Sequence, residues 1–185
     1  GRLVQGGADL VDALLDSGAA KVYATSRSDF APWDERVVPL VLDVTDPASV
    51  ARVADVASDA TIVVNNAGVG GPLAFAEDDT VENWQRQFEI NLRSVMLGCK
   101  HAMPHLRAAA PAAIVNISSL AGLVAAPGMG AYNATKAGVW MYTKTVALEA
   151  AKNDWNVRCN SVHPVFIRTP ILDPFTAMAG GDEAR

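Results

Sequence analysis

Thr61-Ile62-Val63-Val64-Asn65-Asn66-Ala67-Gly68 joins a short apolar run to a turn of small and polar residues. Apolar runs of similar length recur along the chain, and stretches with helical patterning separate them. Short apolar runs between amphipathic helices indicate a parallel sheet that is covered on both faces. We therefore predict a Rossmann-like, doubly wound α/β fold, with residues 1–185 as a single domain. The predicted strands cover residues 21–26, 37–42, 61–65, 113–118 and 157–163.

One helix is predicted before the first strand, and one after each of the second, third and fourth strands. Gly18 ends the first of them, and Asp46 is placed to cap the second, with Pro47 at its first position. The third is a long helical region, and the fourth carries Tyr132. The predicted helices cover residues 8–17, a stretch from residue 47 onward, about 80–106, and about 130–151.

Small and polar residues follow the predicted strands. In open α/β sheets, ligands bind beyond the carboxyl ends of the strands, so these residues are candidates for a binding site. Ala67 and Gly68 would let the backbone approach a cofactor closely, although Asn65–Gly68 also fits an ordinary turn. The segments at these positions are Ser26-Arg27, Asp43-Val44, Asn65–Gly68, Ser118-Ser119 and Pro164–Thr169.

Tyr132-Asn-Ala-Thr-Lys136, with Ser119 thirteen residues upstream, carries the chemistry. Positions i and i+4 share one face of a helix, so Tyr132 and Lys136 are expected to project to the same side. A lysine charge beside a phenol favours phenolate, which would lower the pKa of Tyr132. Such a tyrosine can give a proton to a carbonyl oxygen or accept one from an alcohol. The alternative is a lysine on a solvated helix face.

The chain resembles the short-chain dehydrogenase/reductase family along almost its whole length, from Val11 to Pro170. The resemblance implies an NAD(P)-dependent oxidoreductase acting on a small-molecule alcohol or carbonyl substrate. It implies Tyr132 as general acid/base, Ser119 as the residue that orients the substrate oxygen, and Lys136 as a ligand of the nicotinamide ribose. Asn91 would bend its helix and support a water that links Lys136 to solvent. The motifs that carry the resemblance are Asp43-Val44, Asn65-Asn66-Ala67-Gly68, Asn91, Ile117-Ser118-Ser119, Tyr132/Lys136 and Pro164–Pro170.

The resemblance also implies a cofactor-binding set. In family members that bind NAD, a carboxylate at the end of the second strand would accept hydrogen bonds from the ribose hydroxyls of NAD. This chain has Ser26 and Arg27 at that place. An arginine can clamp the extra phosphate of NADP, so NADP(H) is favoured and NAD(H) remains possible; alternatively, Arg27 pairs with Asp29 or Asp34. The full set is Gly7, Ser26, Arg27, Asp43, Val44, Asn65, Ala67, Gly68, Tyr132, Lys136, Pro164, Ile167 and Thr169.

The two ends depart from the family pattern. Gly7 aligns with the third glycine of the family's first turn, and Gln5 stands where the middle glycine belongs. The sequence is thus expected to lack the first strand, which would leave an apolar slot and unpaired edges, and to lack C-terminal elements. Val165 replaces the glycine usual after the proline. These departures keep a second hypothesis open: a catalytically silent fragment or pseudoenzyme that acts through protein association.

Composition narrows the remaining possibilities. Half of the residues are apolar, 19% are charged and the net charge is -5, without a long basic cluster, so a nucleic-acid partner is not expected. No apolar run approaches the roughly 20 residues of a membrane span. Two cysteines favour a reducing compartment, and we predict a cytoplasmic protein. Cys99, His101 and His105 are interpreted as helix residues rather than metal ligands. The apolar helices bearing Asn91 and Tyr132 favour a homodimer or homotetramer.

Overall fold

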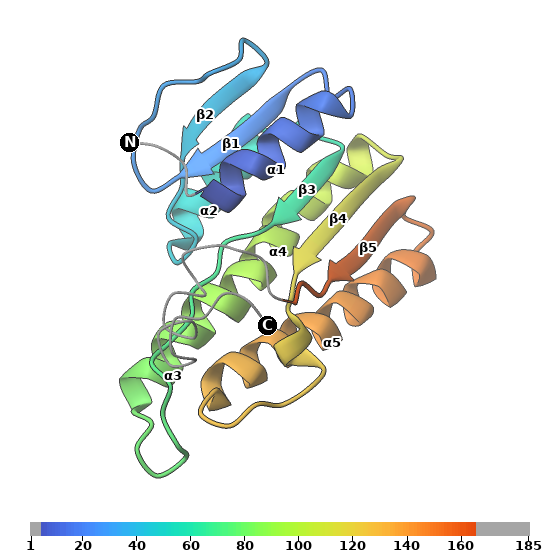
Figure 1. The fold of residues 1–185 in the computed structure, drawn as a ribbon. Coiled ribbons are helices and arrows are strands. Elements are labelled where there is room, and N and C mark those ends of the chain that lie inside the picture. Colours follow the sequence, from blue (N-terminus) through green and yellow to red (C-terminus); the bar gives the residue numbers. More distant parts are fainter. Residues whose placement is uncertain (1–4, 166–185) are drawn as a thin grey trace.

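The computed structural model describes residues 5–165. Apart from β1 and β2, which follow each other directly, helices separate the parallel strands along this part of the chain, with α1 in front of the strands and α4 behind them (Figure 1). The predicted Rossmann-like α/β fold is therefore confirmed. Its elements are α1 (Gln5–Asp16), β1 (Val22–Ser26), β2 (Val37–Val41), α2 (Pro47–Val56), β3 (Ile62–Asn65), α3 (Val81–Gln87), η1 (Phe88–Arg93), α4 (Ser94–Ala108), β4 (Ala112–Ile117), η2 (Leu120–Gly122), α5 (Gly130–Lys152) and β5 (Val157–Val162).

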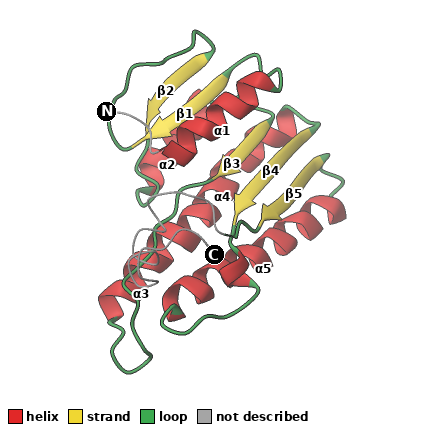
Figure 2. Ribbon diagram, viewed as in Figure 1, coloured by secondary structure: helices red, strands yellow, loops and turns green. Residues whose placement is uncertain are grey.

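The strands form two sheets rather than one. β1 pairs with β2 in parallel, in a register that places Val22 opposite Val37. β3, β4 and β5 form the second parallel sheet, in which Ile62 lies opposite Ala113 and Ala112 opposite Val157. Figure 2 shows the facing edges of β1 and β3 separated from each other. Within residues 5–165, these two edges have no strand partner.

Each sheet has its own apolar core. In the core of the β3–β5 sheet, Ile114 and Val139 are fully buried. Burial of such a side chain stabilises the folded state by roughly 1.5–3 kcal/mol. Cys99 and Cys159 belong to the same cluster, between α4 and β5. The smaller core joins α1 to β1 and β2 through Leu15, with Val11, Val22, Ala24, Phe30 and Val37.

The helix boundaries follow local chemistry. Asp46 Oδ1 accepts a hydrogen bond from the Ala48 amide at 2.9 Å, with Pro47 at the first helical position, as predicted. Gly18 ends α1 with a φ of 93°, a left-handed conformation that suits glycine. The long predicted helical region is continuous from Val81 to Ala108, but it contains a π-helical segment, η1, that the periodicity did not predict.

Candidate active site

Tyr132 and Lys136 lie one turn apart near the start of α5. Lys136 is only 4% exposed, and its Nζ lies 5.8 Å from the centroid of the Tyr132 ring. Nζ donates a hydrogen bond to the carbonyl oxygen of Ile117 at the end of β4, at 2.9 Å. The structure therefore does not place this lysine on a solvated face. It holds the ammonium between the sheet and the tyrosine.

The two serines after β4 have different surroundings. Ser118 is 3% exposed, and its hydroxyl donates to the carbonyl oxygen of Lys136 at 2.8 Å, which joins β4 to α5. Ser119 is more exposed; its Oγ accepts a 3.2 Å hydrogen bond from the Ala121 amide, and its hydroxyl lies near enough to the Tyr132 phenol to lower the pKa of that phenol. The Ser118 hydroxyl is therefore engaged by the α5 backbone, and Ser119 remains the candidate for the substrate-facing hydroxyl.

The pKa values of this pair follow burial. Burial raises the pKa of Tyr132, and the Ser119 hydroxyl partly opposes that rise. Burial also lowers the pKa of Lys136 to about 8. The expected direction for Tyr132, a pKa lowered by the lysine charge, is therefore wrong for this structure, because desolvation of the phenol dominates. A phenol with a raised pKa remains protonated at neutral pH.

Asn91 forms hydrogen bonds both to the segment that follows β3 and to α5. It lies in the π-helical segment η1 and is fully buried. Its Oδ1 accepts from the Val69 amide at 2.8 Å, and its Nδ2 donates to the Val69 carbonyl at 2.9 Å and to Thr135 Oγ1 at 3.4 Å. A Cβ on Gly68 would lie 3.4 Å from both Asn91 Oδ1 and Lys136 Nζ. These contacts bring Gly68, Asn91 and Lys136 together at the carboxyl end of β3.

The candidate phosphate-binding residues lie on the other sheet. Ser26 ends β1 and Arg27 is exposed beyond it. Asp34 pairs with Arg36 at 2.7 Å rather than with Arg27. Asp43 Oδ1 accepts from the Thr45 amide and hydroxyl, and these bonds, with a smaller contribution from Arg27, lower the pKa of Asp43.

The remaining cofactor candidates are distributed as follows. The Asn65 side chain turns inward and donates to Asn116 Oδ1 at 2.8 Å, so only its backbone remains for a cofactor. Pro164 lies beside the serine turn, where its carbonyl accepts from the Leu120 amide. Gly7 lies in the first turn of α1, whereas Val44 and Ala67 follow β2 and β3. Ile167 and Thr169 lie outside the described residues.

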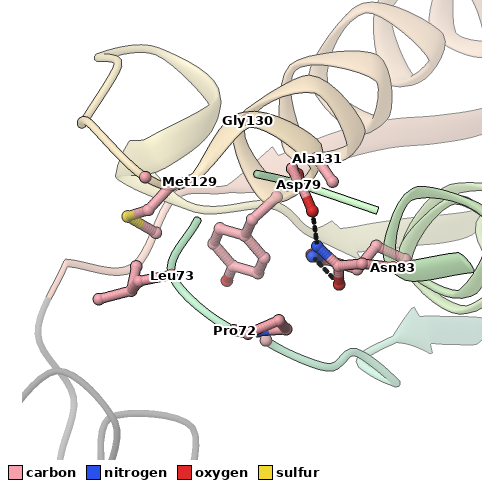
Figure 3. Close-up of a pocket in the computed structure, with 12 residues that line it drawn as sticks. Pro72, Leu73, Asp79, Asn83, Met129, Gly130 and Ala131 are labelled. Atoms are coloured by element: carbon pink, nitrogen blue, oxygen red, sulfur yellow. Dashed lines mark hydrogen bonds between the residues drawn. The ribbon is translucent and has the colours of Figure 1, made fainter. Parts of the chain in front are cut away.

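The structure also reveals polar residues beside Tyr132 that the sequence motifs did not indicate. Asp79, Asn83 and Gln87 border a small cavity together with Pro72, Leu73, Met129, Gly130 and Ala131 (Figure 3). Their spacing of four residues was visible in the sequence. However, a polar i, i+4 row on a helix ordinarily faces solvent, and nothing in the sequence distinguishes a buried one.

Among residues 5–165, no helix is long and apolar enough to cross a membrane. In the same part of the chain, no group of three or more histidine, cysteine or acidic side chains is arranged to hold a metal ion. His105 instead faces Asp55, at 3.2 Å.

Comparison with known proteins identifies the family. The family model described as short chain dehydrogenase matches residues 2–180. The chain therefore belongs to the short-chain dehydrogenase/reductase family, whose members are NAD(P)-dependent oxidoreductases. Among curated proteins, it is 38% identical over 179 residues to the NADP-dependent (R)-specific alcohol dehydrogenase of Lentilactobacillus kefiri, covering 90% of this chain and 71% of that protein.

Other relatives are matched over smaller shares of their length. The chain is 33% identical to 2-(R)-hydroxypropyl-CoM dehydrogenase of Xanthobacter autotrophicus, covering 86% of this chain and 65% of that protein. It is 47% identical over 109 residues to cyclopentanol dehydrogenase of a Comamonas species, covering 59% of this chain and 42% of that protein.

Solved structures agree with the fold. A short chain dehydrogenase from Burkholderia cenocepacia, solved in complex with NADP, superposes with a TM-score of 0.84 at 34% identity, covering 94% of this chain and 72% of the other. ElxO with NADP bound gives a TM-score of 0.86 at 26% identity, covering 96% and 75%.

Proposed function

We propose that this chain is an NADP(H)-dependent oxidoreductase that interconverts a secondary alcohol and a ketone. The observation that carries the proposal is the convergence of Tyr132, Ser119 and Lys136 at the carboxyl ends of β3 and β4, beside Gly68. Similarity to an NADP-dependent alcohol dehydrogenase and to a cyclopentanol dehydrogenase supports the same class of substrate.

In the proposed reduction, the Ser119 hydroxyl donates a hydrogen bond to the carbonyl oxygen of the ketone. Tyr132 then gives its phenolic proton to that oxygen as the carbonyl carbon is reduced. The raised pKa of Tyr132 keeps the phenol protonated beforehand, which suits a proton donor. The Lys136 ammonium, 5.8 Å from the ring centroid, stabilises the phenolate left behind. NADPH, when bound, supplies the hydride.

The residues present fit a dinucleotide. Gly68 keeps a Cβ away from the space beside Lys136, which leaves room for the nicotinamide ribose. Ser26 and Arg27 would hold the 2′-phosphate, since Arg27 is exposed and Asp34, one of its two candidate partners in the sequence, bonds Arg36. Asp43 would face the adenine. Relatives that use or bind NADP support the preference for NADPH over NADH.

One observation favours a second candidate, an inactive protein that acts through association. The two sheets are separate between β1 and β3, and the predicted nucleotide crevice lies across that separation. If the halves do not hold a common geometry, Arg27 and Lys136 cannot reach one nucleotide.

An assay with a panel of ketones tests the proposal. This chain is incubated with NADPH and cyclopentanone, cyclohexanone or a linear methyl ketone, and the alcohol is quantified by chromatography. The proposal predicts alcohol formation in proportion to NADPH consumed, with a lower kcat/KM for NADH. A folded chain that forms no alcohol from any ketone with either nucleotide would favour the second candidate.

A further inference from the structure

Three polar side chains form a row on α3 and the residue before its cap: Asn83 and Gln87 are buried, and Asp79 is partly buried. Asn83 Nδ2 donates to Asp79 Oδ1 at 2.6 Å, and Gln87 Nε2 donates to Asn83 Oδ1 at 3.0 Å. Asn83 is 9% exposed and Gln87 only 2%. We call Asp79, Asn83 and Gln87 the polar row; Figure 3 shows the bond between Asp79 and Asn83.

The row has a fixed direction. A carboxylate only accepts hydrogen bonds, so Asp79 obliges Asn83 to turn its amide nitrogen toward it. The Asn83 oxygen then faces Gln87, which must present its own nitrogen. Gln87 Oε1 is left as the free end, and among the described residues it has no hydrogen-bond partner although it is buried. Burying an acceptor without a hydrogen-bond donor costs free energy. We therefore expect this oxygen to accept a hydrogen bond from a molecule outside the protein.

A small cavity lies beside the row. Gln87, Asn83 and Asp79 line it on one side, and Gly71, Leu73 and the segment from Gly128 to Tyr132 complete it. Its volume of about 10 Å³ is enough for one oxygen-sized group. A Cβ on Gly71 would lie 2.2 Å from Gln87 Nε2 and 2.5 Å from Asn83 Oδ1. Any larger residue at this position would therefore clash with the polar row. The cavity therefore lies between Gln87, whose Oε1 is an unused acceptor, and Tyr132, which we propose gives its proton to the substrate oxygen.

We propose that this cavity is a subsite for one hydroxyl group of the substrate, a second oxygen besides the one that reacts, held by a hydrogen bond to Gln87 Oε1. A water molecule occupies the same place when no substrate is bound. The inference rests on the proposed function, and it narrows the substrate class to hydroxylated ketones and the corresponding diols. Gln87 is then a specificity-determining residue, not a participant in proton transfer.

Selectivity measurements test the hydroxyl subsite. The kcat/KM of each 2-, 3- and 4-hydroxycyclohexanone is divided by that of cyclohexanone, for wild type and for Gln87→Met, which keeps the length of the side chain and removes its oxygen. At least one ratio should fall roughly tenfold in Gln87→Met. Gln85→Met, the same change at an exposed position of the same helix, should leave all ratios as in wild type. If no ratio falls in Gln87→Met, the hydroxyl subsite is refuted.

A crystal structure of the substrate-free chain provides a readout that does not depend on activity. It should show one water within hydrogen-bonding distance of Gln87 Oε1, and a dry cavity would overturn the inference even if the protein reduces ketones. If the water is present but the selectivity ratios are unchanged, the cavity is a hydration site and the substrate part of the proposal is wrong. If the chain reduces no ketone, the proposed function is wrong, and so is the assignment of hydroxylated ketones as substrates. The crystal structure still decides whether the cavity holds a hydrogen-bond donor.

Discussion

Lys136 is a buried cation that no acidic side chain neutralises among the described residues, since its hydrogen bond goes to the Ile117 carbonyl. Removal from water disfavours its charged form, and the same removal disfavours phenolate at Tyr132. The motif spacing predicted that these two residues are neighbours. The opposite signs of their pKa shifts follow from burial, which the spacing alone could not give.

Tyr132→Phe tests the proton-transfer role. We expect a loss of about two to four orders of magnitude in kcat, because the phenolic proton is removed while the ring remains. The affinity for NADPH should change less than about twofold, since the lost hydroxyl faces the substrate. Steady-state rates and a fluorescence titration measure the two quantities. Turnover within a factor of about three of wild type would exclude Tyr132 as the general acid.

Lys136→Met tests the buried charge through pH. The pKa of Lys136 falls from 10.5 in water to about 8 in the fold, so below pH 8 the folded state bears a penalty of about 3 kcal/mol. Between pH 8 and 10.5 the unfolded chain keeps the proton that the folded chain has lost, and wild-type stability rises with pH. The free energy of unfolding of Lys136→Met minus that of wild type should therefore fall by about 3 kcal/mol across this range. Urea unfolding at each pH measures it, and a difference that is constant with pH would contradict the burial account.

Among elements, the contact of η2 with α5 fixes the site most directly. A Cβ on Gly122 would lie 2.7 Å from the backbone carbon and oxygen of Lys136. The turn that follows Ser119 therefore rests on the helix backbone at the level of the lysine. This close packing sets the position of the Ser119 hydroxyl relative to Tyr132.

Gly122→Ala should separate these two elements. The added methyl group meets backbone rather than a flexible side chain, so we expect a destabilisation of about 1–3 kcal/mol and a lower kcat. Gly7→Ala is the matched control: nothing lies within 4 Å of its added Cβ, and replacing a helical glycine should stabilise α1 by up to about 1 kcal/mol. Chemical denaturation of both variants measures these effects. Equal stability of Gly122→Ala and wild type would show that η2 does not rest on α5.

Most elements were predictable because their signals are local. Apolar runs place the strands within one residue at most ends, and Asp46-Pro47 marks the start of α2. Periodicity did not predict the π-helical segment, because it depends on Asn91 bonding the distant backbone of Val69; only the family resemblance implied a bend of the helix at Asn91. Gln87 was missed for a similar reason: its burial depends on Gly71 and on the segment before Tyr132, both remote in sequence.

At the scale of the whole molecule, two cores are joined by few elements. α2 packs against α4, and Asp59 connects to β1 through Lys21 at 2.5 Å and Tyr23 at 2.8 Å. These ion-pair and hydrogen-bond partners are solvent-accessible, and such pairs contribute little to stability. Among the described residues, the packing of α2 on α4 joins the segment that follows β2 to the β3–β5 half.

Hydrogen exchange tests this division. β4 is paired on both sides, whereas β1 and β3 each have one unpaired edge among the described residues. We expect β4 amides to exchange slowest, and about half of the amides in β1 and β3 to exchange at least tenfold faster. Uniform protection of all three strands would show that another strand bridges the two sheets.

A calorimetric titration of this 185-residue chain with NADPH and with NADH tests the central claim most directly, because one nucleotide must contact both halves. We predict saturable binding that is at least tenfold tighter for NADPH. Arg27→Ala should abolish this preference, with little loss of NADH affinity, since only the 2′-phosphate contact is removed. A chain that is folded by circular dichroism and binds neither nucleotide would contradict the account.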